Sequence, residues 1–147
     1  AKTGMRPMFS THPGLTVEQW EQVKDMLDRR GLLKKFHIKS FSIEILQTAY
    51  SVFGTEIDGY TFDISKWQDS HLDTLLNSGI DVSACRVGIE IRFDDYTEQI
   101  AKAIRDAGLF ASAWNIQCRD FSEYERLFSL GVTEFTEDYH CSMGLNH

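Results

Sequence analysis

The 147-residue sequence is poor in cysteine and proline, and these shortages exclude several classes of protein. Its three cysteines, Cys85, Cys118 and Cys141, have neither a paired pattern nor metal-ligand spacing, which excludes a disulfide scaffold and a zinc finger. Two prolines and ten glycines exclude collagen-like and linker-like chains. Because unpaired cysteines are typical of reducing compartments, the sequence favours a cytoplasmic location.

Long apolar runs are also missing. No stretch reaches the roughly 18 apolar residues that a membrane-spanning helix needs, so the sequence predicts no membrane span. The opening residues, AKTGMRPMF, lack the apolar core of a secretory signal peptide. Acidic side chains outnumber basic ones by 22 to 15, giving a net charge of −7. This balance argues against a nucleic-acid partner, because phosphate contacts require clustered Lys and Arg.

What the sequence does contain is a regular alternation of β and α patterns over residues 1–147, which we interpret as a single α/β domain. The segment at 35–41 alternates apolar and polar residues, as expected for a half-buried strand. Strands are predicted at 7–11, 35–41, 57–64, 84–91, 109–116 and 132–135. The helix predicted in each interval ends at a glycine, these being Gly31, Gly54, Gly79, Gly108 and Gly131.

Capping residues mark the expected start of every helix, since their side chains satisfy backbone N–H groups that the first turn leaves free. They are Thr16 with Gln19, Ser42, Ser65, Asp94 or Asp95, and Asp120 with Glu123. The last helix is expected to bury an apolar stripe at helical spacing, made of Phe121, Tyr124, Leu127 and Phe128.

Strands that alternate with helices of this length predict right-handed βαβ units and a mainly parallel sheet. Neither GxGxxG nor GxxxxGK[ST] occurs, so a doubly wound nucleotide-binding fold lacks its usual phosphate loop. The remaining parallel architecture is the TIM (β/α)8 barrel. Because a complete barrel needs at least about 200 residues, this chain is expected to form a partial one.

In such barrels the functional residues follow the carboxyl ends of the strands. The sequence has polar or aromatic residues at every predicted strand end. They are His12; Ser40 and Phe41; Asp63 and Ser65; Glu90 and Arg92; Trp114, Asn115 and Gln117; and residues 136–138.

Four of these are candidate substrate-binding residues, each with a plainer alternative. His12 either donates to a phosphate, or acts as an acid or base, or is an ordinary turn histidine. Trp114 either floors a glycerol- or sugar-sized pocket or belongs to the core, and Asn115 either donates to a ligand or occupies a turn. Glu90 shares a strand face with Arg92, so it either contacts a ligand or forms an exposed ion pair. The pattern assigns no catalytic residue and no metal ligand.

Three short segments resemble a known family. Residues 110–117 read FASAWNIQ, and residues 131–138, one helix later, read GVTEFTED. Upstream, residues 37–41 read HIKSF and lead into a predicted helix. In this order the segments resemble the second half of the barrel of glycerophosphodiester phosphodiesterases.

This resemblance implies a phosphodiester hydrolase of lipid and glycerophosphodiester metabolism. It implies a divalent metal, Ca²⁺ or Mg²⁺, and a glycerophosphodiester or sugar-phosphate ligand. The family's His-Arg, Glu-x-Asp and second-histidine motifs have no match here, and Ser10 and His12 stand where the family has glutamate and lysine. Because serine is a poor ligand for a hard cation, we expect this chain alone to bind no metal and to be inactive. The alternative is a non-catalytic binding or structural module derived from that barrel.

A partial barrel also has consequences for assembly. Six parallel strands out of eight leave two open sheet edges, and open edges pair readily with other strands. We therefore expect either self-association or a further segment that completes the barrel.

Overall fold

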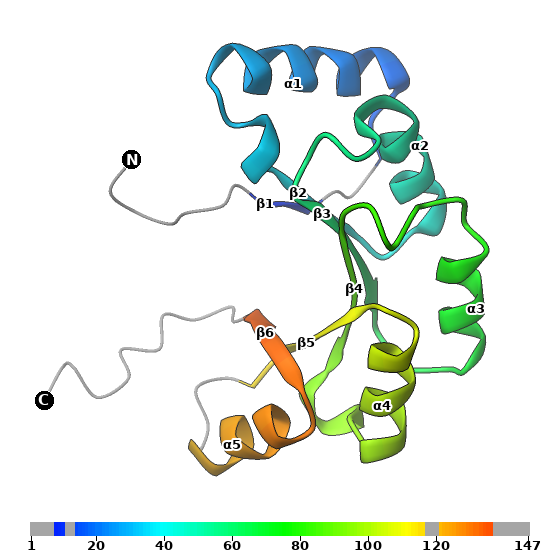
Figure 1. Cartoon of the computed structure of the whole chain (residues 1–147), viewed down its shortest axis with the longest axis vertical. Helices are drawn as coiled ribbons and strands as arrows, with labels where there is room; N and C mark the ends of the chain where they lie inside the picture. Colours follow the sequence, from blue (N-terminus) through cyan, green and yellow to red (C-terminus); the bar gives the residue numbers. More distant parts are fainter. Residues whose placement is uncertain (1–7, 11–13, 117–120, 137–147) are drawn as a thin grey trace, which may run out of the picture.

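The computed structural model describes residues 8–10, 14–116 and 121–136, in which strands and helices alternate along the chain (Figure 1). The strands are β1 (Met8–Ser10), β2 (His37–Ser40), β3 (Gly59–Ile64), β4 (Arg86–Arg92), β5 (Phe110–Trp114) and β6 (Val132–Thr136). The α-helices are α1 (Val17–Arg29), α2 (Ile43–Phe53), α3 (Ser70–Leu76), α4 (Glu98–Asp106) and α5 (Phe121–Ser129). Two short 3-10 helices, η1 (Leu33–Lys35) and η2 (Phe93–Asp95), precede β2 and follow β4.

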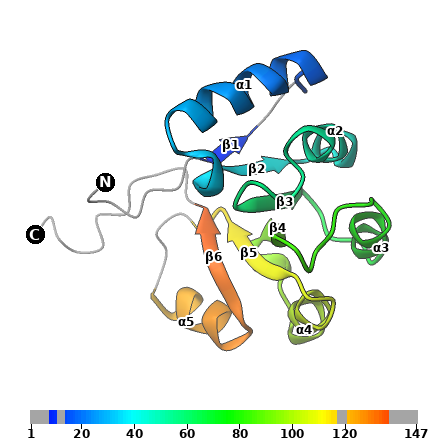
Figure 2. The same ribbon diagram turned by 45° about the horizontal axis from the view of Figure 1, so that its top comes forward.

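The strands pair in parallel and stand in the sheet in their order along the sequence, from β1 to β6. Figure 2 shows the helices around the outside of this fan of strands. A doubly wound sheet reverses its strand order at a switch point, whereas a barrel adds each new strand on the same side. The predicted fold class, a partial (β/α)8 barrel of parallel strands, is therefore confirmed.

The two faces of the sheet differ in chemistry because successive side chains of a strand point in opposite directions. The outer face carries buried apolar side chains, among them Ile38, Tyr60, Phe62, Val87, Ile89, Ile91, Ala111 and Ala113. The inner face carries buried polar side chains, among them His37, Lys39, Thr61, Asp63, Glu90 and Ser112. Each large apolar side chain on the outer face contributes about 1.5–3 kcal/mol through its burial. The helices therefore hold the sheet from outside, while the inner face is free to carry polar groups.

The prediction that residues 35–41 form a half-buried strand is wrong about the burial of β2. All four residues of β2 are buried, and Lys39 and His37 on the inner face are 6% and 2% exposed. Polar and apolar residues do alternate along β2, but both faces of the strand are buried. The inner face is covered because β4 and β6 curve round and bring their own side chains against it.

Helix starts agree with the predicted caps where the cap bonds a nearby backbone N–H. Thr16 accepts from the Gln19 N–H at 3.2 Å, and Ser42 accepts from the Ile45 N–H at 3.3 Å. The prediction for Ser65 is wrong, because α3 begins at Ser70. The turn before α3 is held by other contacts, in which the Trp67 indole donates to Asp69 at 3.1 Å.

The predicted start of α4 is also wrong. Asp94 and Asp95 lie in η2, and α4 begins after Thr97, whose hydroxyl accepts from the Ile100 N–H at 3.2 Å. None of the helices in the described parts of the chain is long and apolar enough to cross a membrane.

Helix α5 buries less of its apolar stripe than predicted. Leu127 is fully buried and Tyr124 partly so, but Phe121 and Phe128 are 63% and 59% exposed. The predicted cap Asp120 lies outside the described residues. The exposure follows from position, because α5 lies beside β6 at an edge of the sheet. The Phe128 ring makes an edge-to-face contact with the Phe135 ring, with the two centroids 5.1 Å apart.

Candidate functional site

Five neighbouring strands each place one polar side chain on the inner face, in the half of the sheet nearer the carboxyl ends of the strands. We call this group the inner polar cluster, and it consists of Lys39, Asp63, Glu90, Ser112 and Thr136. Segments far apart in the sequence meet here, since Lys39 and Thr136 are 97 positions apart. Because βα barrels bind ligands at the carboxyl ends of their strands, this cluster is the candidate site.

Glu90 is the centre of the cluster. Its carboxylate receives the Lys39 ammonium on Oε1, and on Oε2 the hydroxyls of Ser112 at 2.6 Å and Thr136 at 2.9 Å. A carboxylate that is 2% exposed needs such donors, because an uncompensated buried charge is strongly unfavourable. The expected exposed ion pair of Glu90 with Arg92 is wrong, since the structure pairs Arg92 with Asp94 at 2.8 Å.

Lys39 links the two carboxyl groups of the cluster. Its ammonium bonds Glu90, donates to the Thr136 hydroxyl at 3.3 Å and lies 3.8 Å from Asp63 Oδ2. The lysine side chain is 7% exposed. A positive charge is thus fixed between two acidic side chains.

Asp63 differs from Glu90 in how its oxygens are satisfied. Among the described residues, its buried Oδ1 has no hydrogen-bond partner. Burial raises the pKa of Asp63 to about 7, and the neighbouring Glu90 charge also raises it, against the opposing effect of Lys39. A buried acid with a perturbed pKa next to a fixed charge is a recognised mark of a functional site.

The layer toward the amino ends of the strands closes the cluster from below. The His37 ring contacts Asp58 through Nδ1 at 2.9 Å and Thr61 through Nε2 at 2.7 Å. The Phe110 ring lies over Gly88, where a Cβ atom would come within 2.4 Å of it. The cluster therefore has a packed floor.

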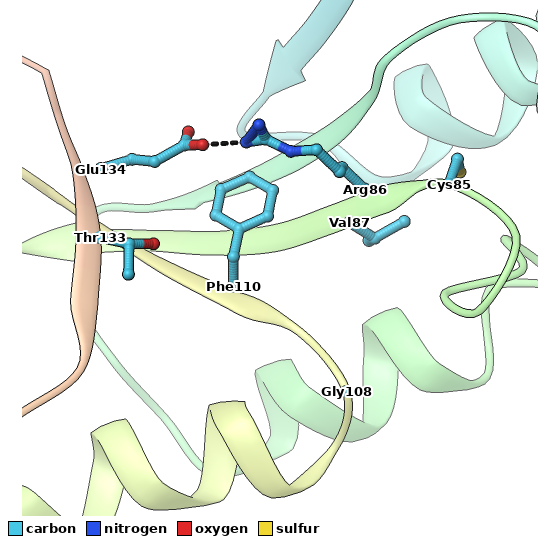
Figure 3. A pocket seen from close by; sticks show the side chains of 7 residues that line it. All are labelled: Cys85, Arg86, Val87, Gly108, Phe110, Thr133 and Glu134. Atoms are coloured by element: carbon cyan, nitrogen blue, oxygen red, sulfur yellow. Dashed lines mark hydrogen bonds and ion pairs between the residues drawn. The ribbon is translucent and has the colours of Figure 1, made fainter.

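A cavity of about 370 Å³ lies beyond this floor, near the amino ends of β4 and β5 (Figure 3). Arg86 lies 4.9 Å above the Phe110 ring and pairs with Glu134, as Figure 3 shows. The cavity is lined by Cys85, Arg86, Val87, Gly108, Phe110, Thr133 and Glu134. Because it opens at the end opposite to the one that βα barrels use for ligands, it is the weaker candidate.

The predicted site residues fall in different places. Glu90 lies in the inner polar cluster, whereas His12 lies outside the described residues. Trp114 is partly buried at the end of β5 and donates to the Ile64 carbonyl at 3.4 Å, which ties β5 to the end of β3. Asn115 adopts a positive φ of 67°, a conformation that asparagine tolerates in turns. The ligand contacts predicted for these residues stay predictions.

Sequence reasoning missed the role of Lys39 and Ser112, and named Asp63 without giving it one. A signal was present, because Asp63, Glu90 and Ser112 each lie between two outward-facing apolar neighbours, and Lys39 follows one, Ile38. Aligning these inward positions across successive predicted strands would have placed them on one face.

The described residues do not fit a divalent metal ion. No group of three or more His, Cys, Asp or Glu side chains in residues 8–10, 14–116 and 121–136 is arranged to hold one. Ca²⁺ takes six to eight oxygen ligands and Mg²⁺ a full octahedron. In the inner polar cluster the Lys39 ammonium lies where a cation would have to approach both carboxyl groups, and it repels one.

Comparison with solved structures finds the same architecture in phosphodiesterases. A candidate glycerophosphodiester phosphodiesterase from Galdieria sulphuraria matches with a TM-score of 0.73 and 12% identity, over 94% of this chain and 55% of that one. A phosphodiesterase from Oleispira antarctica, solved with its product sn-glycerol-3-phosphate, matches at 0.69 and 20%, over 92% and 52%. A glycerophosphodiester phosphodiesterase from Parabacteroides distasonis matches at 0.62 and 16%, over 90% and 53%.

The fold is that of part of a glycerophosphodiester phosphodiesterase barrel. The chain spans about half the length of the structures it matches. The resemblance predicted from the three sequence segments is thereby confirmed for the fold. No protein-family model matches the sequence, and no curated protein matches it with significance.

Proposed function

We propose that residues 1–147 form one domain that binds a glycerophosphodiester or sugar phosphate on the inner face of a phosphodiesterase-type barrel. One observation carries the proposal: five neighbouring strands converge on a buried polar cluster at the ligand-binding end of a barrel. The likeness to phosphodiesterases, one of them solved with sn-glycerol-3-phosphate, supports a phosphate-containing ligand.

The same geometry favours binding without hydrolysis by this chain alone. Attack on phosphorus needs a group that stabilises the charge developing on the phosphate oxygens, and phosphodiesterases commonly use a metal ion for it. The described residues do not fit such an ion. Lys39 supplies one positive charge, but Glu90 neutralises it. We therefore assign to this chain the recognition of the ligand, with Trp114 and the inner polar cluster as the contact surface.

A specific observation favours a second function, that of a non-catalytic structural module. The Glu90 carboxylate already accepts from three donors within the cluster, so most of its bonding capacity is used internally. A polar network satisfied in this way also stabilises a barrel interior without any ligand.

Calorimetric titration of the purified chain with sn-glycero-3-phosphocholine, glucose 6-phosphate and choline separates these functions. We expect saturable heat with a phosphate-containing ligand and none with choline. Incubation with Mg²⁺ or Ca²⁺ is expected to release no glycerol 3-phosphate. Turnover by the chain alone would contradict the division of roles, and absence of binding by either phosphate compound would favour the structural module.

We also propose that the chain associates with a second copy of itself or with a barrel-completing segment. In the described residues β1 and β6 have a strand neighbour on one side each, and unpaired edges attract other strands. The exposed Phe121 and Phe128 lie on α5 beside the β6 edge. Light scattering after size exclusion is expected to give a mass above 16.9 kDa at micromolar concentration, and a sharp monomer peak would contradict self-association.

A further inference from the structure

The inner polar cluster has one acidic group that its own contacts leave incomplete. Glu90 accepts from three donors, whereas Asp63 Oδ1 has no partner among the described residues. The Asp63 side chain is 7% exposed and lies one residue before the end of β3. A buried oxygen without a hydrogen-bond partner is unfavourable, and a ligand that bonds Asp63 Oδ1 at this end of the barrel would satisfy it.

The charges of the cluster determine which kind of ligand can bond Asp63 Oδ1. Lys39 and Glu90 are in contact and cancel each other. An ionised Asp63 would give the cluster a net charge of minus one, whereas a protonated Asp63 leaves it neutral. The cluster with an ionised Asp63 repels an anionic phosphodiester, whereas a protonated Asp63 donates a hydrogen bond to it. A metal cation is disfavoured in both, since the Lys39 ammonium lies 3.8 Å from Asp63.

We propose that Asp63 is the ligand-contacting group of the cluster, and that its protonated carboxyl donates a hydrogen bond from Oδ1 to a phosphate oxygen of a phosphodiester. This inference rests on the proposed function and adds the contact residue and its protonation state. Lys39 lies beside the bound phosphate as the nearest positive charge.

The electrostatic surroundings of Asp63 agree with this role. The charged groups facing it in the described chain are Lys39 on β2 and Glu90 on β4, the two strands that flank β3. Burial, together with Glu90 and against the opposing effect of Lys39, holds the pKa of Asp63 near 7, and a bound anion raises it further. Binding of a phosphodiester therefore takes up a proton, and affinity falls as the pH rises through neutrality.

The test is a calorimetric titration with sn-glycero-3-phosphocholine, whose phosphate diester keeps one negative charge throughout. For the wild-type chain we expect affinity to fall about tenfold between about pH 6 and about pH 8. Asp63→Asn carries an amide donor at every pH, so its affinity should change less than about twofold over this range. Asp73→Asn makes the same substitution at an exposed position on α3 and should keep the wild-type profile.

The outcomes separate this inference from the proposed function. If the wild-type chain binds the diester and Asp63→Asn shows the same pH profile, the inference is overturned and the proposed function stands. If the wild-type chain does not bind at either pH, the proposed function fails and this inference with it. Should Asp63→Asn not fold, carboxyl carbon NMR of the wild-type chain decides: a titration midpoint near 7 supports the inference, and one below about 5 overturns it.

Discussion

The two ends of the inner face hold similar ion pairs in very different surroundings. At the carboxyl end Lys39 and Glu90 are 7% and 2% exposed. At the amino end Arg86 and Glu134 are 38% and 32% exposed, beside an open cavity (Figure 3). Water screens the second pair and is excluded from the first.

This contrast shows which end of the inner face is suited to a functional site. At the buried end, burial raises the pKa of the neighbouring Asp63 to about 7, while Lys39 lowers it and Glu90 raises it. Near the exposed pair, Arg86 instead lies over the Phe110 ring, and both residues line the open cavity. Burial therefore distinguishes a reactive arrangement from a structural one, although the residue types are alike.

Removing the positive partner of each pair should give the largest difference between the two ends. Lys39→Met leaves Glu90 buried without its ammonium and is expected to cost about 3–5 kcal/mol in free energy of unfolding. Arg86→Met removes a half-exposed pair and is expected to cost about 1 kcal/mol or less for the ion pair. Urea unfolding followed by circular dichroism measures both. Equal losses would show that the two ends share one environment.

The pH dependence of stability should isolate Asp63. Its pKa is raised from 3.8 to about 7 on folding, so the folded chain binds the proton more tightly than the unfolded chain. The stability that the proton contributes is complete below pH 3.8 and is lost as the pH rises through about 7. The expected loss from this group is on the order of 4 kcal/mol.

Asp63→Asn should remove most of this slope and raise stability above neutral pH relative to the wild type. The control is Asp73→Asn, an exposed carboxyl on the helix that follows β3, which should leave the slope unchanged. Urea midpoints measured from about pH 4 to about pH 8 make the comparison. A slope that survives in Asp63→Asn would assign the titration to another group.

How well each feature of the fold could be predicted from the sequence depends on how close in the sequence its interacting residues lie. The caps at Thr16 and Ser42 were predictable because each bond spans three residues. The start of α3 was not, because a Trp67–Asp69 contact holds residues that the apolar spacing assigns to the helix. Alternation in β2 revealed two faces but not what covers them.

The candidate site was less predictable for the same reason. Glu90 was named from its place at a strand end, yet its partners Lys39 and Thr136 are 51 and 46 positions away. Strand order and curvature bring them together, and neither is encoded in a local pattern. Phe128 shows the converse, since its helical spacing predicts burial but the edge position of β6 leaves it exposed.

The smallest expected effect concerns a single donor to Glu90. Ser112→Ala removes a buried hydroxyl that donates to the carboxylate at 2.6 Å, and is expected to cost about 2 kcal/mol in free energy of unfolding. The matched control is Ser129→Ala, whose hydroxyl makes an equally short bond, 2.6 Å, to a backbone carbonyl at an exposed position of α5. Its loss should stay within about 0.5 kcal/mol, because water replaces the bond. A Ser112→Ala loss as small as the control would show that Lys39 and Thr136 alone satisfy Glu90, and that the cluster tolerates loss of a donor.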